Sequence, residues 1–539
     1  MKFKLLVFFW FVLFSTFAQT EDAWVYFADK PDETYFMANP LEMLSQKALD
    51  RRTTQNIVLE TNDIPISQSY ISQISNVTGV TIMAKSKWLN ALHVRGSFTD
   101  LQALTTLSFV TEVRFANHSL NLRIANNSQT EKTTTLQNKW DVSVMYNYGG
   151  ASNQVQMLNA HLLHQQDYTG SGKTVAVLDS GFIGVNTAQS FQNLFANNLI
   201  LGGYNFPDRN TNFYTRHNHG TNVLSTMGGY VDNQLVGTAP NAAYYLFITE
   251  DVNSENPVEE SYWVEAAEMA DSLGVDIINS SLGYGQYDNP NYSYNYAQRN
   301  GQVGFASRGA SIAFSKGIVC VLSAGNSGAT SEPHVGIPAD ATNVLTVGAV
   351  TSTESYASFS SIGPTSDTRI KPDVAALGVA ATISDTSGNI TAASGTSFSS
   401  PILAGAIASF WSAVPSLTAA EVIQYVKESA DQFQNPDNFK GYGVPDFQLA
   451  LMNALNIESF EKSQLTLYPN PVQDNLYLNL PHNTKGSFVL YDFLGKKILE
   501  TTLNQDNTIL TLSELHSGVY LYDFSTNNSK LRGKIIKQK

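Results

Sequence analysis

The chain has 539 residues, of which 43% are hydrophobic and only 14% charged, and its 32 basic and 46 acidic side chains give a formal net charge of −14. The near-normal apolar content excludes a disordered chain or one built of many membrane spans, and the acidic balance argues against nucleic-acid binding, which needs clustered Lys and Arg. The single cysteine, Cys320, excludes an intrachain disulfide, an all-cysteine zinc site and an iron–sulfur cluster.

The first 18 residues have the pattern of a secretory signal peptide. Lys2 and Lys4 precede an apolar run over residues 5–14. Thr16 and Ala18 are small residues at the positions that a signal peptidase requires, so we expect cleavage after Ala18. The run is shorter than the roughly 20 residues of a membrane-spanning helix, and the sequence predicts an exported chain without a membrane span after signal removal.

Residues 19–116 form a first block in which strand and helix patterns alternate. The predicted strands lie at 23–27, 80–83, 91–94 and 110–115, and the predicted helices at 41–52 and 101–107. The order strand–helix–strand–strand–helix–strand is the split βαβ pattern of a small α+β, ferredoxin-like domain. Residues 117–145 are polar and lack clear periodicity, so we expect them to form a linker.

Residues 146–456 form the main block, which we expect to be an α/β domain. Apolar runs rich in β-branched residues lie at 174–178, 243–248, 277–278, 318–322 and 344–347. Strands that are apolar on both faces, with helical stretches between them, predict a parallel sheet covered by helices on both sides. A Tyr- and Asn-rich loop at 284–296 is inserted in this block, and its role, shaping an outer cleft or covering the surface, stays open.

After a short polar linker at 457–464, residues 465–539 form the last block. Short strand patterns lie at 465–467, 476–480, 489–493, 509–512 and 519–524, separated by turn residues. At this size the pattern predicts a small antiparallel β-sandwich.

Two polar segments of the main block carry groups suited to acid–base chemistry. Asp179 follows the apolar strand 174–178, at the edge where open α/β sheets place ligand sites. His219 begins a helical pattern, where a carboxylate can hold its ring in one tautomer and let it act as a base. Taken alone, an Asp at this position is more often a turn or helix-cap residue. His217 and His219 could instead share a metal ion, although no third ligand is evident nearby.

Two further segments supply a hydrogen-bond donor and a hydroxyl. Asn326 follows strand 318–322 on a turn between Gly325 and Gly328, which leaves its amide free to donate. Ser397 precedes Pro401, a residue tolerated only in a first helical turn, and small residues follow that let the helix sit in the core. We therefore expect Ser397 at the N-terminus of a buried helix, whose free N–H groups favour negative charge.

Asp, then His, then Ser is the chain order of the catalytic triad in subtilisin. The four segments together closely resemble the subtilisin-like serine peptidase (subtilase) family, in which an Asn lies between His and Ser. Further matching segments lie at 279–283, 336–339, 347–349, 359–363 and 371–374. The resemblance implies the subtilisin-like parallel sheet and a serine endopeptidase that acts through an acyl-enzyme intermediate.

Each site residue has a role implied by this resemblance. Ser397 is the nucleophile, His219 the general base, and Asp179 the group that orients His219. The Asn326 side-chain amide, with the Ser397 N–H, forms the oxyanion hole. No cofactor or metal is required for catalysis; structural calcium, common in the family, stays open and has no assigned ligands.

The resemblance also implies the substrate-binding residues. Two runs should form the walls of the primary specificity pocket, the first also pairing with the substrate backbone: Ser281, Leu282 and Gly283, and Ser323, Ala324 and Gly325. None of the six is charged, which favours an apolar or unspecific residue before the scissile bond over a basic one; the pocket floor is not identified. The resemblance further predicts a cis peptide bond between Ile337 and Pro338.

The flanking blocks resemble domains that accompany such peptidases. Residues 19–116 resemble the inhibitory propeptide of subtilisin-like zymogens, an intramolecular inhibitor and chaperone, which places the processing region within 117–145. Residues 465–539 resemble the sorting domain of the type IX secretion system of Bacteroidetes, on the segments 467–471, 491–496, 518–520 and 534–537. These resemblances imply an exported zymogen, secreted or attached to the cell surface, whose partners are protein or peptide substrates, its own propeptide and the export machinery.

Two other functions stay open at this point. One is a catalytically inactive surface protein or adhesin on a subtilase scaffold, against which the presence of all four site residues argues. The other is a metal hydrolase that uses His217 and His219. The natural substrate and the mature N-terminus do not follow from the sequence.

Overall fold

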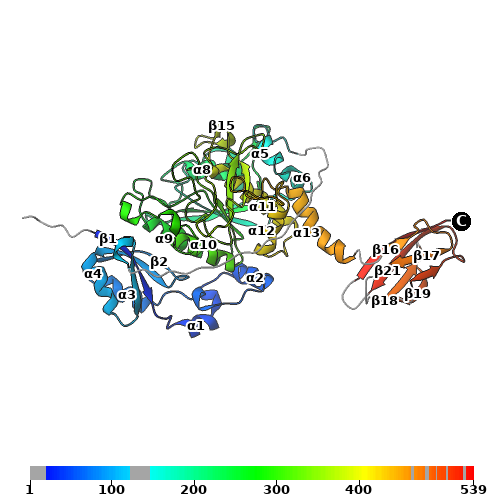
Figure 1. The fold of residues 1–539 in the computed structure, drawn as a ribbon, viewed down its shortest axis with the longest axis horizontal. Coiled ribbons are helices and arrows are strands. Elements are labelled where there is room, and N and C mark those ends of the chain that lie inside the picture. Colours follow the sequence, from blue (N-terminus) through cyan, green and yellow to red (C-terminus); the bar gives the residue numbers. More distant parts are fainter. Residues whose placement is uncertain are drawn as a thin grey trace, which may run out of the picture. The chain divides into compact units, whose positions relative to one another are not determined.

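The computed structural model describes residues 20–121, 146–462, 466–479, 485–492, 495–504, 508–525 and 530–538 (Figure 1). The predicted signal peptide and nearly all of the predicted linker 117–145 lie outside these residues. The chain divides into two compact units, Met1–Ala450 and Leu451–Lys539. Among the described residues, no helix combines the length and apolar character needed to cross a bilayer.

The N-terminal domain of the first unit is a four-stranded antiparallel sheet with helices packed on it. Its strands follow the order β2-β3-β1-β4. The elements are β1 (Thr20–Phe27), α1 (Glu33–Ala38), α2 (Gln46–Thr54), α3 (Gln68–Ser75), β2 (Val80–Ser86), β3 (Ala91–Ser97), α4 (Phe98–Ala103) and β4 (Val110–Phe115). Val25, Leu92, Val94 and Leu101 belong to its core. The split βαβ prediction is confirmed.

One predicted helix of this domain begins later than expected. The apolar spacing predicted a helix over 41–52, whereas α2 starts at Gln46, because the Ser45 hydroxyl accepts a hydrogen bond from the Ala48 N–H and caps the helix there. Residues Pro40–Glu42 form a separate short 3₁₀ turn.

The main domain of the first unit is a seven-stranded parallel sheet in the order β13-β12-β11-β10-β5-β9-β6. The strands are β5 (Thr174–Asp179), β6 (Ile200–Asn205), β9 (Ala243–Ile248), β10 (Ile277–Ser280), β11 (Val319–Ser323), β12 (Leu345–Val350) and β13 (Val374–Leu377). Five of these were predicted to within a few residues. The pattern missed β6, whose alternation is broken by Gly202 and Gly203, and β13.

Helices cover both faces of this sheet. The helices that matter for the site are α8 (His219–Gly228), α9 (Val258–Leu273), α10 (Phe305–Ser315), α11 (Thr396–Ala413) and α12 (Ala419–Glu428). In β10, Ile278 packs into the cluster beneath α9 and α10, while the next residue, Asn279, accepts a hydrogen bond from Ser400 of α11 at 3.0 Å. Consecutive strand residues point to opposite faces, so these helices lie on opposite sides of the sheet, as predicted.

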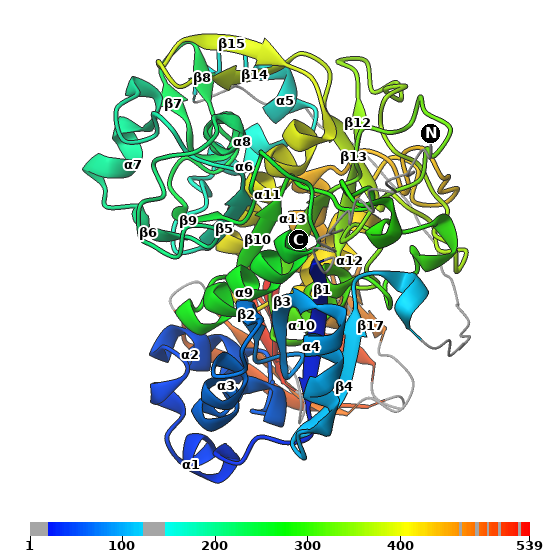
Figure 2. The ribbon, with the colours of Figure 1, turned by 90° about the vertical axis from the view of Figure 1, so that its left-hand side faces the viewer.

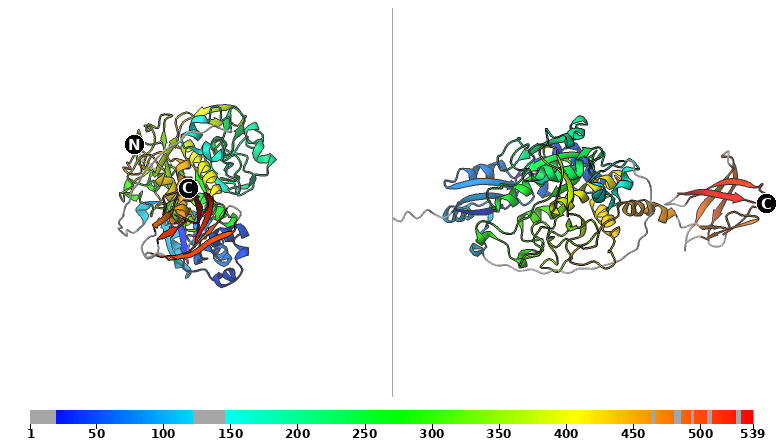
Figure 3. Two further views of the ribbon diagram at one scale, coloured as in Figure 1. Left: turned by 90° about the vertical axis from the view of Figure 1, so that its right-hand side faces the viewer. Right: turned by 90° about the horizontal axis from the view of Figure 1, so that it is seen from above.

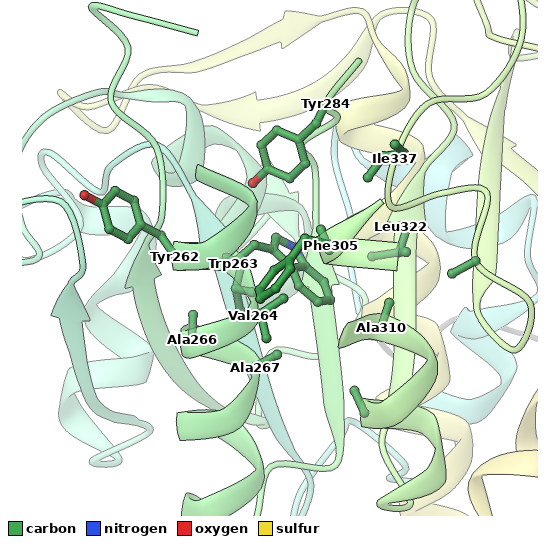
Figure 4. Close-up of a cluster of buried hydrophobic side chains, with 14 of the residues drawn as sticks. Tyr262, Trp263, Val264, Ala266, Ala267, Tyr284, Phe305, Ala310, Leu322 and Ile337 are labelled. Carbon is green, nitrogen blue, oxygen red and sulfur yellow. The ribbon is translucent and has the colours of Figure 1, made fainter. Parts of the chain in front are cut away.

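The core beneath α9 and α10 is centred on aromatic side chains. Figure 4 shows Trp263 of α9 beside Phe305 at the start of α10, with Tyr284 and Ile337 on the loops above them. Trp263 is fully buried, and its indole N–H donates to the Ser280 hydroxyl at 2.9 Å. The C-terminal end of β10, where the next loop begins, is therefore fixed to the core.

The second unit contains two antiparallel sheets of orange and red strands (Figure 3). One has the order β16-β17-β20 and the other β19-β18-β21-β22. The strands are β16 (Thr466–Tyr468), β17 (Asn475–Asn479), β18 (Gly486–Tyr491), β19 (Lys497–Leu503), β20 (Ile509–Thr511), β21 (Gly518–Ser525) and β22 (Lys530–Lys537). Leu476, Phe488 and Ile535 lie in the core between them. The predicted β-rich architecture is confirmed, but charged residues hid β19 and β22 from the pattern.

Helix α13 (Phe447–Lys462) precedes these strands and continues through the first six residues of the predicted linker 457–464. That linker therefore begins as helix.

Candidate active site

Asp179 and His219 meet at the C-terminal edge of the parallel sheet. Asp179 is the last residue of β5 and His219 the first residue of α8. The Asp179 Oδ1 and His219 Nδ1 atoms are 2.8 Å apart, and the Asp179 side chain is completely buried. Gly220 permits this approach, since a Cβ there would lie 2.9 Å from the Asp179 Cβ and 2.5 Å from the Gly181 carbonyl oxygen.

The surroundings of His219 favour its protonated form. Burial by itself would lower the pKa of His219, but the adjacent Asp179 carboxylate and the more distant Glu250 outweigh it, and the pKa lies above its ordinary value of 6.5. The Asp179 contact also fixes the tautomer, because Nδ1 then carries the proton and Nε2 is left as the acceptor.

Ser397 is the second residue of α11, directly after Thr396 and the turn at Gly395, whose φ is +152°. Its Oγ donates to the Ser281 carbonyl at 3.4 Å, and the ring of Phe398 lies 6.2 Å from that of His219. In the part of the chain that the structure describes, no hydrogen bond joins Ser397 to His219. Such bonds are often long in an enzyme without substrate.

Pro401 leaves the Ser397 carbonyl free to bond with Ser281 on the wall of the cavity. It is the sixth residue of α11, one turn later than the first-turn position expected from the sequence. Because proline has no N–H, the carbonyl of Ser397, four residues earlier, loses its helical partner. That carbonyl accepts instead from the Ser281 hydroxyl at 2.9 Å.

Asn326 is held with its amide nitrogen toward Ser397. Its Oδ1 accepts from the Thr396 N–H at 2.9 Å and from the Thr396 hydroxyl at 3.0 Å, which leaves Nδ2 as the donor. A Cβ on Gly395 would lie 3.6 Å from the Asn326 Nδ2 and 3.7 Å from the Ser397 N. The two donors therefore flank one small space that any larger residue at 395 would occupy.

A cavity of about 380 Å³ contains Ser397 and Asn326. All six residues expected in the pocket walls line it: Ser281, Leu282, Gly283, Ser323, Ala324 and Gly325. The peptide bond between Ile337 and Pro338, on the same rim, is cis as predicted. Three charged or titratable lining residues were missed: Glu255, Arg299 and His334. No spacing signal marks them, since all three lie in irregular loops.

Three parts of the chain match known families. Residues 22–135 match the peptidase S8 propeptide domain of Bacteroidota, residues 170–443 the subtilase family, and residues 466–538 the secretion system C-terminal sorting domain. The chain belongs to the subtilase family. It is a serine-type peptidase with a zymogen propeptide and a sorting tail, which indicates export by the Bacteroidota secretion pathway.

Individual relatives agree with this assignment. The chain is 31% identical over 281 residues to subtilisin DY of Bacillus licheniformis, covering 51% of this chain and 90% of that protein. It is 32% identical over 302 residues to the subtilisin of Bacillus pumilus, covering 55% and 97% respectively. Subtilisin NAT of Bacillus subtilis subsp. natto is also 32% identical over 302 residues, or 55% of this chain and 70% of that protein.

The alternative metal pair has no support in the geometry of this subtilase. His219 Nδ1 is engaged with Asp179, while the exposed His217 ring lies 3.2 Å from the Ser180 hydroxyl. Within the described ranges, no group of three or more His, Cys, Asp or Glu side chains is placed to hold a metal ion. Structural calcium stays a prediction without assigned ligands.

The Tyr-rich insertion both covers the core and borders the cavity. Tyr287 and Tyr294 donate to one carboxylate oxygen of the buried Glu260 on α9, at 2.7 and 2.8 Å. Burial raises the pKa of Glu260 above its usual value, while these hydroxyls oppose that shift. Tyr284 of the insertion also lines the cavity, and Arg299 follows three residues after its end.

The N-terminal domain packs onto α9 and α10 of the subtilase domain (Figure 2). The Glu268 carboxylate on α9 accepts hydrogen bonds from the Ser86 hydroxyl at 2.6 Å and from the Lys87 and Trp88 N–H groups at 2.9 Å each. Trp24 stacks on Phe305 with ring centroids 5.2 Å apart.

A buried ion pair also connects the two domains across this interface. Arg52 of α2 contacts Asp271 of α9 at 2.8 Å, and both side chains are at most 2% exposed. Shifting one domain relative to the other would separate Arg52 from Asp271 and leave a buried charge without this partner, which is strongly destabilising.

Proposed function

We propose that this chain is an exported serine endopeptidase that cleaves peptide bonds through Ser397, His219 and Asp179. The observation that carries the proposal is the contact of 2.8 Å between Asp179 and His219, on the same sheet edge as Ser397. The buried carboxylate orients the ring, and the ring presents Nε2 to the cleft.

The reaction follows from these positions. The Ser397 Oγ attacks the peptide carbonyl carbon while His219 Nε2 takes its proton, and the developing oxyanion accepts hydrogen bonds from the Asn326 Nδ2 and the Ser397 N–H. The imidazolium is stabilised by Asp179 and gives its proton to the leaving amine. A water molecule, deprotonated by the same ring, then hydrolyses the acyl-enzyme and restores the Ser397 hydroxyl.

The walls of the cavity suit an extended peptide. The run that begins at Ser281 continues directly from β10 (Ile277–Ser280), so its backbone can pair with a substrate strand beside Ser397. Ser323, Ala324 and Gly325 close the opposite side, where the substrate side chain before the scissile bond would enter.

The propeptide and the tail set when and where this activity operates. We infer that residues 19–116 inhibit the enzyme until processing within 117–145 releases them. We infer also that residues 465–539 direct the chain across the outer membrane, after which it is secreted or held at the cell surface.

A fluorophosphonate probe tests the catalytic assignment, because it reacts only with an activated serine. The matured wild type should be labelled, whereas Ser397→Ala should not. Labelling should survive metal chelators, which separates this function from a metal hydrolase. A matured, folded wild type that takes no label would favour the inactive adhesin instead.

A further inference from the structure

Arg299 places a positive charge in the wall of the cavity that contains Ser397. It directly follows the short 3₁₀ turn Tyr296–Gln298, which begins at the last residue of the Tyr-rich insertion. Its side chain lines the same cavity as the six pocket-wall residues, and the residue is only 6% exposed. The sequence led us to expect a pocket with uncharged walls. The six wall residues are uncharged, but Arg299, three residues after the insertion, adds a guanidinium beside them.

This guanidinium is not neutralised by the protein. Its Nη1 donates to the His334 carbonyl at 3.2 Å, and this is its one side-chain hydrogen bond among the described residues. None of the ion pairs formed within that part of the chain includes Arg299. Arg369 differs: it pairs with Asp367 at 2.8 Å and donates to the Asp340 and Ala341 carbonyls. The Nε and Nη2 atoms of Arg299 are not among the fully buried, unpaired polar atoms, so these donors are open to a partner that supplies acceptor oxygens.

The donors of Arg299 face the pocket wall. Its Nη2 would lie 3.7 Å from a Cβ on Gly285, a cavity-lining residue two positions after Gly283. Tyr284, between them, forms a backbone bridge with Ile337, which holds this loop against the rim of the cavity. The same loop therefore builds the pocket wall and frames the guanidinium.

Glu255 and His334 also line the cavity, and neither cancels the charge of Arg299. Glu255 makes no ion pair with it, and burial together with Asp288 raises the pKa of Glu255. Burial and the nearby Arg299 charge lower the pKa of His334 below 6.5, so this ring is neutral at neutral pH. Arg299 is thus the permanent cation among the described residues that line this cavity.

We propose that Arg299 selects substrates with an acidic residue immediately before the scissile bond. The substrate carboxylate supplies the acceptors that the guanidinium lacks, and such charge-assisted pairs are strong and directional. This inference rests on the proposed function, since it concerns the pocket beside Ser397. It replaces the apolar preference expected from the uncharged walls alone.

The test compares peptides of one sequence that differ only in that residue: Glu, its neutral isostere Gln, Leu or Lys. For the matured wild type we expect kcat/KM for Glu to exceed that for Gln by about 10- to 100-fold at low salt, the range given by one charge-assisted hydrogen-bonded pair. In Arg299→Gln the Glu-to-Gln ratio should fall to about one. Arg299→Glu should reverse the preference, so that Lys is cleaved faster than Glu.

Arg369→Gln is the matched control, because it removes a partly buried guanidinium that does not line the cavity; it should keep the wild-type ratio. Rates are normalised to the sites titrated with the fluorophosphonate probe, which excludes misfolded enzyme. A wild-type Glu-to-Gln ratio of one or less overturns the proposal, even if the variants do not fold. So does an Arg299→Gln enzyme that keeps the wild-type ratio. Labelling without an acidic preference refutes this inference alone, whereas absence of labelling refutes the proposed function.

Discussion

Replacing Glu268 with alanine should weaken the binding of the propeptide to the enzyme. The carboxylate receives three hydrogen bonds, two of them from the backbone N–H groups of Lys87 and Trp88, which lose this acceptor when it is removed. Truncating one partner of such a buried charged contact costs about 2–4 kcal/mol, which is about 30- to 1000-fold in the inhibition constant.

The assay is inhibition of the matured enzyme by the separately added propeptide, residues 19–121. Glu428→Ala serves as a control, because this half-buried glutamate lies on α12, and its one side-chain hydrogen bond among the described residues comes from Gln424 on the same helix, at 2.7 Å. An inhibition constant within about threefold of wild type for Glu268→Ala would refute the reasoning, since even one lost hydrogen bond to a charged group exceeds that.

The pH dependence gives a second readout of the same contact. Burial raises the pKa of Glu268 from 4.5 to about 7 in the docked state, although Lys87 and the hydrogen bonds oppose that shift. Since the docked state has the higher pKa, docking takes up a proton between about pH 4.5 and 7, and inhibition should weaken as pH rises through that window. Glu268→Ala should lose this slope; an unchanged slope would assign it to another group.

Three further outcomes follow from the site and the domain order. Asn326→Ala should lower kcat by about 10²- to 10³-fold, the loss established for this oxyanion-hole donor in subtilisin, with little change in KM; equal activity would exclude that role. Because Asp179 helps raise the pKa of His219 above 6.5, kcat/KM should rise with pH through a midpoint above 6.5, and a profile peaking near pH 4 would contradict the base assignment. Deleting residues 465–539 should leave peptidase activity intact but retain it in the cell envelope, as fractionation would show; efficient release of the truncated enzyme would argue against a sorting role.

The sheet and the positions of Asp179, His219 and Ser397 were predictable because their signals are local. The strands of the main domain are buried on both faces, so they read as unbroken apolar runs; β5 is buried throughout. Asp179, His219 and Ser397 each follow such a run or begin a helix, where the sequence itself marks the position. By contrast, β19 and β22 carry lysines and other charged residues, and a hydrophobic pattern passes over them.

The orientation of the Asn326 side chain and the presence of Arg299 in the cavity could be found only from the structure. Asn326 points its amide toward Ser397 only because Thr396, 70 residues later, occupies the carbonyl side. Arg299 reaches the cavity through an irregular loop whose course depends on tyrosines bonded to Glu260. Neither arrangement follows from a periodicity, since both depend on contacts between distant segments.

The insertion connects inhibition with specificity, because Tyr292 within it contacts the propeptide, while Tyr284 at its start and Arg299 just after it line the cavity. The Tyr292 hydroxyl donates to Glu21 of β1 at 3.0 Å, and the His118 ring lies 3.1 Å from the Tyr292 carbonyl. A substitution at Tyr292 would alter contacts in both domains at once. Its effect on substrate choice would therefore be mixed with its effect on release of the propeptide. The Arg299 hydrogen bonds, within the described residues, stay inside the subtilase domain. Substitution at Arg299 therefore separates the two effects, and a change in substrate preference without a change in propeptide affinity would assign specificity to Arg299 and not to the part of the insertion that contacts the propeptide.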